Sequence, residues 1–346
     1  MSSFLLQAAA VCHQGRVRKN NEDNLYFDKH ILAEIHDGIQ EGYWITAGES
    51  GQPKLYGVFD GMGGHAKGEV ASYIAADTAR KAVEEQVAFD GLSDADEVAD
   101  RTLDRTGKSN NSSKEMESEQ IFALLKAICQ DANKLVCQEM EEAKSRVGTT
   151  GSMLYFYKSR YYLCNIGDSP IYLVRGGEAT PVFEEHTERL MNERLYGKEK
   201  TKGKKYPLTQ HIGIFPEEMT IEPYVTSGAV QAGDIYLICS DGLTDMVVMD
   251  EILEIIQECN ELPEVVLRLQ EKALENGGRD NITIIAIRAL AAGTHSKTCE
   301  NKSEKSEWMG KRKSSVEDST TNPKINLTEN KKESKIAKFW RKLTEY

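Results

Sequence analysis

Five short runs of β-branched and aromatic residues, each bounded by Gly, Asp or Asn, constrain the fold of this chain most strongly. Such runs predict β-strands, because these side chains pack well on a pleated surface. The runs cover residues 55–59, 161–166, 171–174, 235–239 and 282–287. Residues 4–12 lack a basic leader and predict a further strand rather than a signal peptide. Residues 161–174 predict a hairpin that folds over Gly167-Asp168-Ser169-Pro170.

Three other segments carry apolar residues at helical spacing, over residues 69–89, 121–136 and 265–273. Helices near both ends of a body rich in hairpin-like strands predict an α+β fold with a predominantly antiparallel sheet.

Composition excludes several classes of protein. The net charge of −12 argues against a basic nucleic-acid-binding chain. The sequence contains no run of about 18 apolar residues, so we expect no transmembrane helix. The seven cysteines are odd in number and form no C-x-x-C pair. This pattern argues against a disulfide framework or a zinc site and predicts a reducing, cytoplasmic location.

Two segments have the composition of poorly ordered chain. Residues 292–346 hold 13 Lys+Arg and 8 Asp+Glu with few apolar residues, and we expect a disordered basic tail. Within it, residues 335–345 predict a short basic amphipathic helix, with Ile336, Phe339, Trp340 and Leu343 on one face. Such a helix fits an anionic membrane surface or a partner's groove, and a frayed end is the alternative. Residues 93–119 predict a flexible surface insertion.

Acidic residues recur where the predicted strands begin or end. Asp60 and Asp241 each follow a strand and precede Gly, Asp280 directly precedes the last strand, and Asp168 lies in the predicted turn. Glu22 and Asp23 close a polar run that begins at residue 15. Carboxylates held at strand ends are rigid ligands for a hard cation.

Clusters of this kind favour Mg²⁺ or Mn²⁺, which prefer oxygen ligands, and several Asp side chains would repel one another without a cation. Two such ions can activate a water and hold a phosphoryl oxygen. Arg18, four residues before Glu22, could bind two phosphate oxygens. A single Asp-Gly pair is more often an ordinary turn, and Arg18 alone could be a surface charge.

Seven ordered blocks make the chain similar to the metal-dependent serine/threonine protein phosphatases, the protein phosphatase 2C family. The blocks are GRVRKNNEDN (15–24), VFDGMGGHAKGEVAS (58–72), GTTG (148–151), NIGDSPIYLV (165–174), LTQHIG (208–213), SDGLTD (240–245) and GGRDNIT (277–283). One Asp-Gly block is weak evidence, whereas seven in the family's order are highly specific. The DGMGGH block resembles bacterial members.

The resemblance implies a four-layer αββα sandwich, in which two antiparallel sheets are flanked by helix pairs. Residues 1–291 would form the catalytic domain. Residues 187–216 resemble the mobile flap beside the site of the bacterial members. The Lys-rich run within it, residues 198–206, would favour acidic surroundings in substrates, although a solvated charge run is the commoner reading.

The resemblance also implies the metal ligands. Asp60 would bridge two Mn²⁺ or Mg²⁺ ions, and Asp241 with Asp280 would complete one site. The backbone carbonyl of Gly61 would join the other, which Glu22 and Asp23 would bind directly or through water.

Two further roles follow from the resemblance. Asp168, together with Asp241, resembles the position that holds a third, weaker ion. Arg18 would hold the substrate phosphate. Animal members often have His, the proposed general acid, where this chain has Met62. His65 is therefore a candidate proton donor, although a lone His is more often structural and a metal-held water is the alternative acid.

The expected function is hydrolysis of phosphoserine and phosphothreonine on proteins by a hydroxide that bridges the metal ions. Two alternatives remain: a non-catalytic phosphoprotein-sensing module on the same fold, and a phosphatase dedicated to one regulatory protein of the anti-sigma-antagonist type. The resemblance implies phosphoprotein substrates, a cognate Ser/Thr protein kinase and a monomeric enzyme.

Overall fold

The computed structural model describes residues 4–40, 42–50, 52–63, 67–97, 110–197 and 205–291. The chain divides into two units, Met1–Ser306 and Glu307–Tyr346, and every described residue belongs to the first. The tail at residues 292–346, with its expected helix, lies outside the described residues and stays a prediction.

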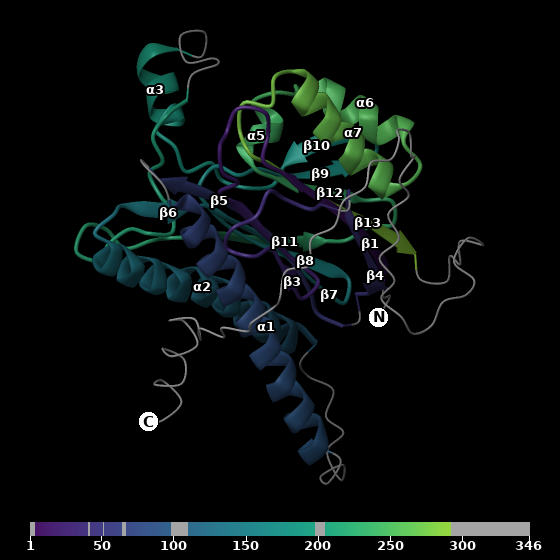
Figure 1. The fold of residues 1–346 in the computed structure, drawn as a ribbon. Helices are drawn as coiled ribbons and strands as arrows, with labels where there is room; N and C mark the ends of the chain where they lie inside the picture. Colours follow the sequence, from purple (N-terminus) through teal and green to yellow (C-terminus); the bar gives the residue numbers. More distant parts are fainter. Residues whose placement is uncertain are drawn as a thin grey trace, which may run out of the picture. The chain divides into compact units, whose positions relative to one another are not determined.

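Two antiparallel sheets form the centre of the first unit (Figure 1). The six-stranded sheet has the order β10-β9-β12-β13-β1-β4. Its strands are β1 (Phe4–His13), β4 (Trp44–Glu49), β9 (Ile171–Arg175), β10 (Glu178–Pro181), β12 (Ile235–Cys239) and β13 (Ile282–Ala291). In the other sheet the order is β11-β8-β7-β5-β2-β3, and β6 pairs with β5. Its strands are β2 (Asp23–Phe27), β3 (His30–Ile31), β5 (Lys54–Gly63), β6 (Val147–Thr149), β7 (Gly151–Tyr157), β8 (Arg160–Ile166) and β11 (Tyr224–Ala229).

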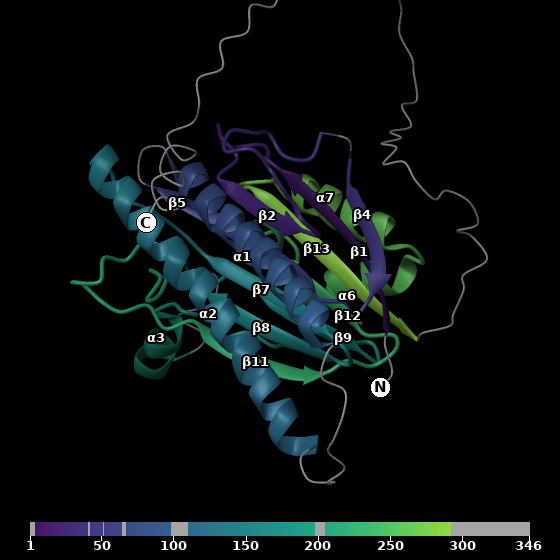
Figure 2. The same ribbon diagram turned by 90° about the horizontal axis from the view of Figure 1, so that it is seen from below.

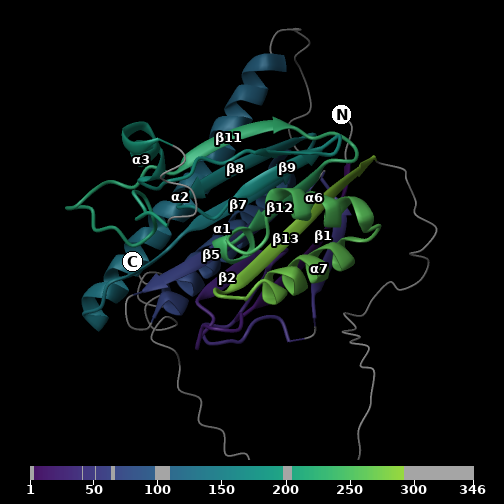
Figure 3. The ribbon, with the colours of Figure 1, turned by 90° about the horizontal axis from the view of Figure 1, so that it is seen from above.

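Helices cover the outer face of each sheet. The long helices α1 (Gly68–Glu97) and α2 (Asn110–Ala143) cross the sheet that contains β5 and β8 (Figure 2). On the other side, α6 (Met249–Glu258) and α7 (Leu262–Glu275) lie over β12, β13 and β1 (Figure 3). The expected four-layer sandwich of two antiparallel sheets between helix pairs is therefore confirmed.

Three apolar clusters hold the layers together. One joins α1 and α2 to their sheet, a second lies between the sheets, and a third joins α6 and α7 to the six-stranded sheet. The stripe predicted for α7 is buried in the third cluster, with Val265, Val266 and Leu269 fully covered. The periodicity marked the correct face because a helix beside a sheet buries one stripe.

The predicted hairpin over residues 161–174 is wrong. Strand β8 pairs with β7 and β11, whereas β9 pairs with β10 and β12 in the other sheet. The turn at Gly167, whose φ is +104°, is thus a crossover between sheets. A turn signal shows where the chain reverses but does not choose a strand's partner, and the crossover carries Asp168 to an edge shared by both sheets.

The predicted insertion is also too long. Helix α1 extends to Glu97 and α2 begins at Asn110, so residues 93–97 and 110–119 are helical rather than loop. Polar helix ends carry little apolar periodicity, which is why composition alone assigned them to a loop. Residues 98–109 lie outside the described residues.

Six of the cysteines lie among the described residues, and all six are buried and free. Among the helices of the described ranges, none is long and apolar enough to cross a membrane.

Candidate active site

Asp23 and Asp60 are placed beside each other by strand pairing. Asp23 is the first residue of β2 and is the direct partner of Asp60 in antiparallel β5. Asp23 is fully buried, and Asp60 is partly buried. Thr150 fixes the same end of β5, since its hydroxyl accepts a hydrogen bond from the Asp60 backbone N–H.

Asp241 and Asp280 meet at the neighbouring end of the other sheet. Asp241 opens the short helix α5 (Asp241–Thr244) directly after β12, and Asp280 lies just before β13. The two segments touch closely, because a Cβ on Gly242 would lie 1.9 Å from the carbonyl oxygen of Asn281. Only glycine fits there, and its contact fixes Asp241 beside the loop that carries Asp280.

Glu22 and Gly61 meet at the start of α1. The Gly61 N–H donates to the carbonyl oxygen of Glu22 over 3.1 Å. A Cβ on Gly68 would lie 3.0 Å from Glu22 Oε1, so the carboxylate stands against the first residue of the helix. The helix N-terminus favours this negative charge.

The buried carboxylates disfavour one another's ionised forms. The pKa of Asp60 is raised well above its ordinary value, first by burial and then by the charges of Asp23, Asp241, Asp168 and Asp280. Burial, with Asp280 and Asp241, raises the pKa of Asp23 to about 7 against hydrogen bonds from Thr283 and Ser240. Burial and Asp241 also raise the pKa of Asp168 to about 7. Acids from four separate segments therefore share one electrostatic environment around Asp60.

Two cationic side chains reach the same carboxylates. Arg18 Nε lies 2.7 Å from Asp280 Oδ1, and its Nη1 lies 4.0 Å from Glu22 Oε2. Lys205 Nζ lies 2.7 Å from Asp241 Oδ2 and 2.8 Å from Asp245 Oδ2. The spacing of Arg18 to Glu22 made it a candidate, but its pairing with Asp280 was not predicted, and nothing in the sequence singled out Lys205 within its Lys-rich run.

Polar residues that the sequence analysis missed hold the acids in place. The Asn281 side chain accepts from the Glu22 N–H and donates to the carbonyl oxygens of Gln14 and Asn20. Thr283 donates its hydroxyl proton to Asp23 Oδ2 over 2.7 Å. Both follow Asp280 in the block GGRDNIT, so their place in the sequence was the available signal.

The acidic set suits a hard divalent cation. Its donors are carboxylate oxygens and the carbonyl of Gly61, and the ammonium group of Lys205 already lies beside two of these carboxylates, Asp241 and Asp280. As the side chains stand, no three acidic, His or Cys groups in the described ranges converge closely enough to hold one ion. The ion pairs to Arg18 and Lys205 hold several of these carboxylates instead.

The fold thus gathers Arg18, Glu22, Asp23, Asp60, Gly61, Asp168, Asp241 and Asp280 at one edge of the two sheets. Met62 follows in β5. His65, the candidate proton donor, lies outside the described residues.

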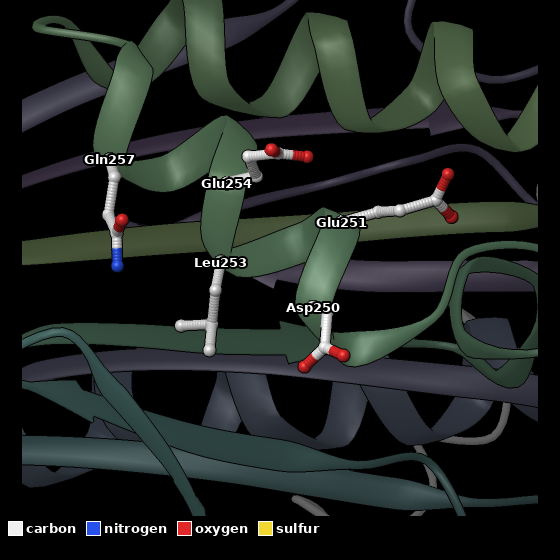
Figure 4. Close-up of a pocket in the computed structure, with 5 residues that line it drawn as sticks. All are labelled: Asp250, Glu251, Leu253, Glu254 and Gln257. Carbon is white, nitrogen blue, oxygen red and sulfur yellow. The ribbon is translucent and has the colours of Figure 1, made fainter.

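A separate surface depression lies on α6 and is lined by Asp250, Glu251, Leu253, Glu254 and Gln257 (Figure 4). None of these five residues was predicted to take part in the site. Acidic side chains on an exposed helix are ordinarily solvated, and we assign the depression no function.

Comparison with known proteins identifies similar chains. The family described as Protein phosphatase 2C matches residues 40–272. Serine/threonine protein phosphatase PstP of Mycobacterium tuberculosis is 31% identical over 287 residues, which cover 82% of this chain and 45% of PstP. Protein phosphatase PhpP of Streptococcus pneumoniae is 30% identical over 66% of this chain and 82% of PhpP. This chain therefore spans about half the length of PstP and most of PhpP.

A solved structure shares the architecture. The catalytic domain of PstP, crystallised in complex with two manganese ions, superposes with a TM-score of 0.58 at 30% identity. The match covers 83% of this chain and 99% of that domain. The family match spans more than half of the chain and agrees with the fold and with the seven sequence blocks. The chain therefore belongs to the protein phosphatase 2C family.

Proposed function

We propose that this chain is a Mn²⁺- or Mg²⁺-dependent phosphatase that hydrolyses phosphoserine and phosphothreonine on proteins. The observation that carries the proposal is the environment of Asp60, whose pKa is raised by burial and by four other carboxylates. Such a concentration of buried negative charge is unfavourable for a fold unless cations neutralise it. The relatives PstP and PhpP, both named protein phosphatases, support the same conclusion.

In this proposal Asp60 would contribute to holding both ions, one together with Asp241 and Asp280. The Gly61 carbonyl would contribute to holding the other, with Glu22 and Asp23 directly or through water. Asp168, with Asp241, would hold a third and weaker ion. When bound, these ions neutralise the carboxylates, lower the pKa of a water and withdraw electrons from the phosphoryl oxygens.

The protein's own groups bind and orient the ester. Arg18 is half exposed, with 47% of its side chain accessible, and its guanidinium can turn toward a phosphate while remaining near Asp280. Two parallel hydrogen bonds to phosphate oxygens would fix the ester for in-line attack. Met62 cannot donate a proton to the departing alkoxide, so we propose that His65 or a metal-held water would take this role.

The chemistry also implies a partner. A phosphatase for phosphoserine and phosphothreonine requires a Ser/Thr protein kinase that supplies its substrates, and we propose such a kinase as the cognate partner of a monomeric enzyme. The six free buried cysteines support a reducing, cytoplasmic setting.

The test is turnover of a phosphoserine peptide with added Mn²⁺. Asp60→Asn should lower kcat by at least about a hundredfold, because it removes the bridging ligand. The control Asp131→Asn changes an exposed residue of α2 and should retain wild-type turnover. A wild-type chain that binds Mn²⁺ but releases no phosphate would instead favour the phosphoprotein-sensing alternative, and unchanged turnover in Asp60→Asn would contradict the assignment.

A further inference from the structure

The ammonium group of Lys205 is surrounded by three acidic side chains. Its Nζ lies 2.7 Å from Asp241 Oδ2, 2.8 Å from Asp245 Oδ2 and 3.7 Å from Asp280 Oδ2. Asp241 begins α5 and Asp245 directly follows this helix, whereas Asp280 lies in the loop before β13. Lys205 therefore connects these segments through one positive charge.

The backbone near Lys205 is tied to the body of the protein. Thr187 and Leu208 form an isolated antiparallel bridge, and Glu188 N–H donates to the carbonyl oxygen of Pro207 over 3.1 Å. The neighbouring His186 N–H donates to the carbonyl oxygen of Gly167, at the crossover that carries Asp168. Lys205 thus extends into the acidic site from an anchored end of the flap (residues 187–216).

We propose that Lys205 is an internal cation that competes with the divalent metal for Asp241 and Asp280, so that metal binding and release of this end of the flap are linked. The inference rests on the metal site of the proposed function and adds a regulatory contact to it. Bound metal would weaken the association of Lys205 with these carboxylates, and the ion pairs would lower the affinity for metal by the same factor.

The competition follows from the oxygens that the two cations share. A carboxylate oxygen at 2.7 Å from an ammonium group cannot also hold a metal ion without movement of that group, since two cations at such spacing repel strongly. The Lys205 side chain is 64% exposed, so it can move into solvent without passing through packed protein. Exposed ion pairs are individually weak, and a divalent ion at sufficient concentration would displace them.

Isothermal titration calorimetry with Mn²⁺ on the full chain tests the competition directly. Lys205→Gln should bind Mn²⁺ about three- to tenfold more tightly than wild type, because the competing charge is gone. The control Lys204→Gln removes the same charge one residue earlier and should bind with wild-type affinity.

The possible failures are distinguishable. Equal or weaker Mn²⁺ affinity in Lys205→Gln, beside a wild-type chain that binds Mn²⁺, would overturn the competition and leave the metal site in place. An equal gain in Mn²⁺ affinity in Lys204→Gln would show that the overall charge of the flap causes the effect, and it would overturn the specific role of Lys205. Absence of Mn²⁺ binding by every form would overturn both this inference and the proposed function.

Chemical labelling gives a second measurement. Saturating Mn²⁺ should raise the rate at which an N-hydroxysuccinimide ester acylates Lys205, measured by peptide mass spectrometry, because the released amine loses its carboxylate partners. Lys126, exposed on α2, serves as the reference and should be labelled at a constant rate. An unchanged labelling rate at Lys205 with saturating Mn²⁺ would contradict the proposed release.

Discussion

Asp23 and Asp60 are direct partners across the antiparallel β2–β5 pair. Opposed residues in such a pair have Cβ atoms about 4.5–5.5 Å apart, and like charges at this spacing destabilise a sheet. Burial and Asp23 both raise the pKa of Asp60. The strand register that builds the site therefore also stores electrostatic repulsion, which bound cations would relieve.

This repulsion predicts how Asp23→Asn changes stability with pH. The pKa of Asp23 is about 7 in the fold against an ordinary 3.8, so the fold favours the protonated acid. Its contribution to stability is full below pH 3.8 and is lost as pH rises through about 7. Asparagine resembles the protonated acid and has no such loss. In EDTA, we expect urea unfolding to give Asp23→Asn a higher free energy of unfolding than wild type at pH 8. This difference should disappear near pH 4.

Asp131→Asn is the control for this experiment, since Asp131 is exposed on α2. Its free energy of unfolding should differ from wild type by the same small amount at both pH values. If the free energy of unfolding of Asp23→Asn also differed from wild type by the same amount at pH 4 and pH 8, the raised pKa of Asp23 would be disproved.

Arg18 is expected to act on substrate affinity. Arg18→Gln removes a group that could bind phosphate, and it should raise KM about tenfold with a smaller change in kcat. Inhibition by inorganic phosphate should weaken in parallel. Lys19→Gln, which changes the adjacent exposed cation, should leave both values unchanged. A loss confined to kcat would show that Arg18 does not anchor the phosphate.

Asp234 should matter for stability but not for chemistry. It lies at the opposite end of β12 from Asp241, its side chain is 1% exposed, and Arg175 Nε and Nη2 each donate to it over 2.7 Å. The Tyr236 hydroxyl also donates to it. Asp234→Ala leaves these donors without an acceptor and should lower the free energy of unfolding by about 2–4 kcal/mol. Turnover per folded molecule should stay at the wild-type value, and a selective fall in kcat would count against this separation of roles.

Much of the fold could be predicted because its signals are local. The predicted strand that became β12 is an apolar run ended by Asp241, and α7 carries a single apolar stripe. Strand partners are not local, which is why the turn at Gly167 was assigned to a hairpin rather than to a crossover between sheets. The polar ends of α1 and α2 gave no periodic signal at all.

The residues of the candidate site also fall into two groups, those that local sequence signals identify and those that they do not. Acids next to strand ends, such as Asp60 and Asp280, could be recognised from position and family resemblance. Lys205 could not, because its contact with Asp241 spans 36 residues and depends on the hydrogen bond between Glu188 and Pro207 that fixes the backbone nearby. Asn281 was equally hidden, since an Asn beside an Asp in a loop has no distinctive pattern until its hydrogen bonds to Glu22 and Asn20 are known.

Gly242 should prove essential for the spacing between Asp241 and Asp280. A Cβ at this position would lie 1.9 Å from the Asn281 carbonyl oxygen and 3.4 Å from Asp280 Cβ, so Gly242→Ala must push α5 away from the neighbouring loop. Backbone atoms cannot yield as a flexible side chain does, and we expect a loss of about 1–3 kcal/mol in the free energy of unfolding. Separation of the two carboxylates should also weaken Mn²⁺ binding in calorimetry.

Gly177→Ala is the matched control, because Gly177 has a φ of +86° but faces only the flexible end of Gln257, 3.4 Å away. Alanine there should strain the backbone and lower stability without changing Mn²⁺ affinity. The pair of variants thus separates general destabilisation from damage to the site. If Gly242→Ala bound Mn²⁺ as tightly as Gly177→Ala, close contact between α5 and the loop before β13 would not be what sets the geometry of the acidic site.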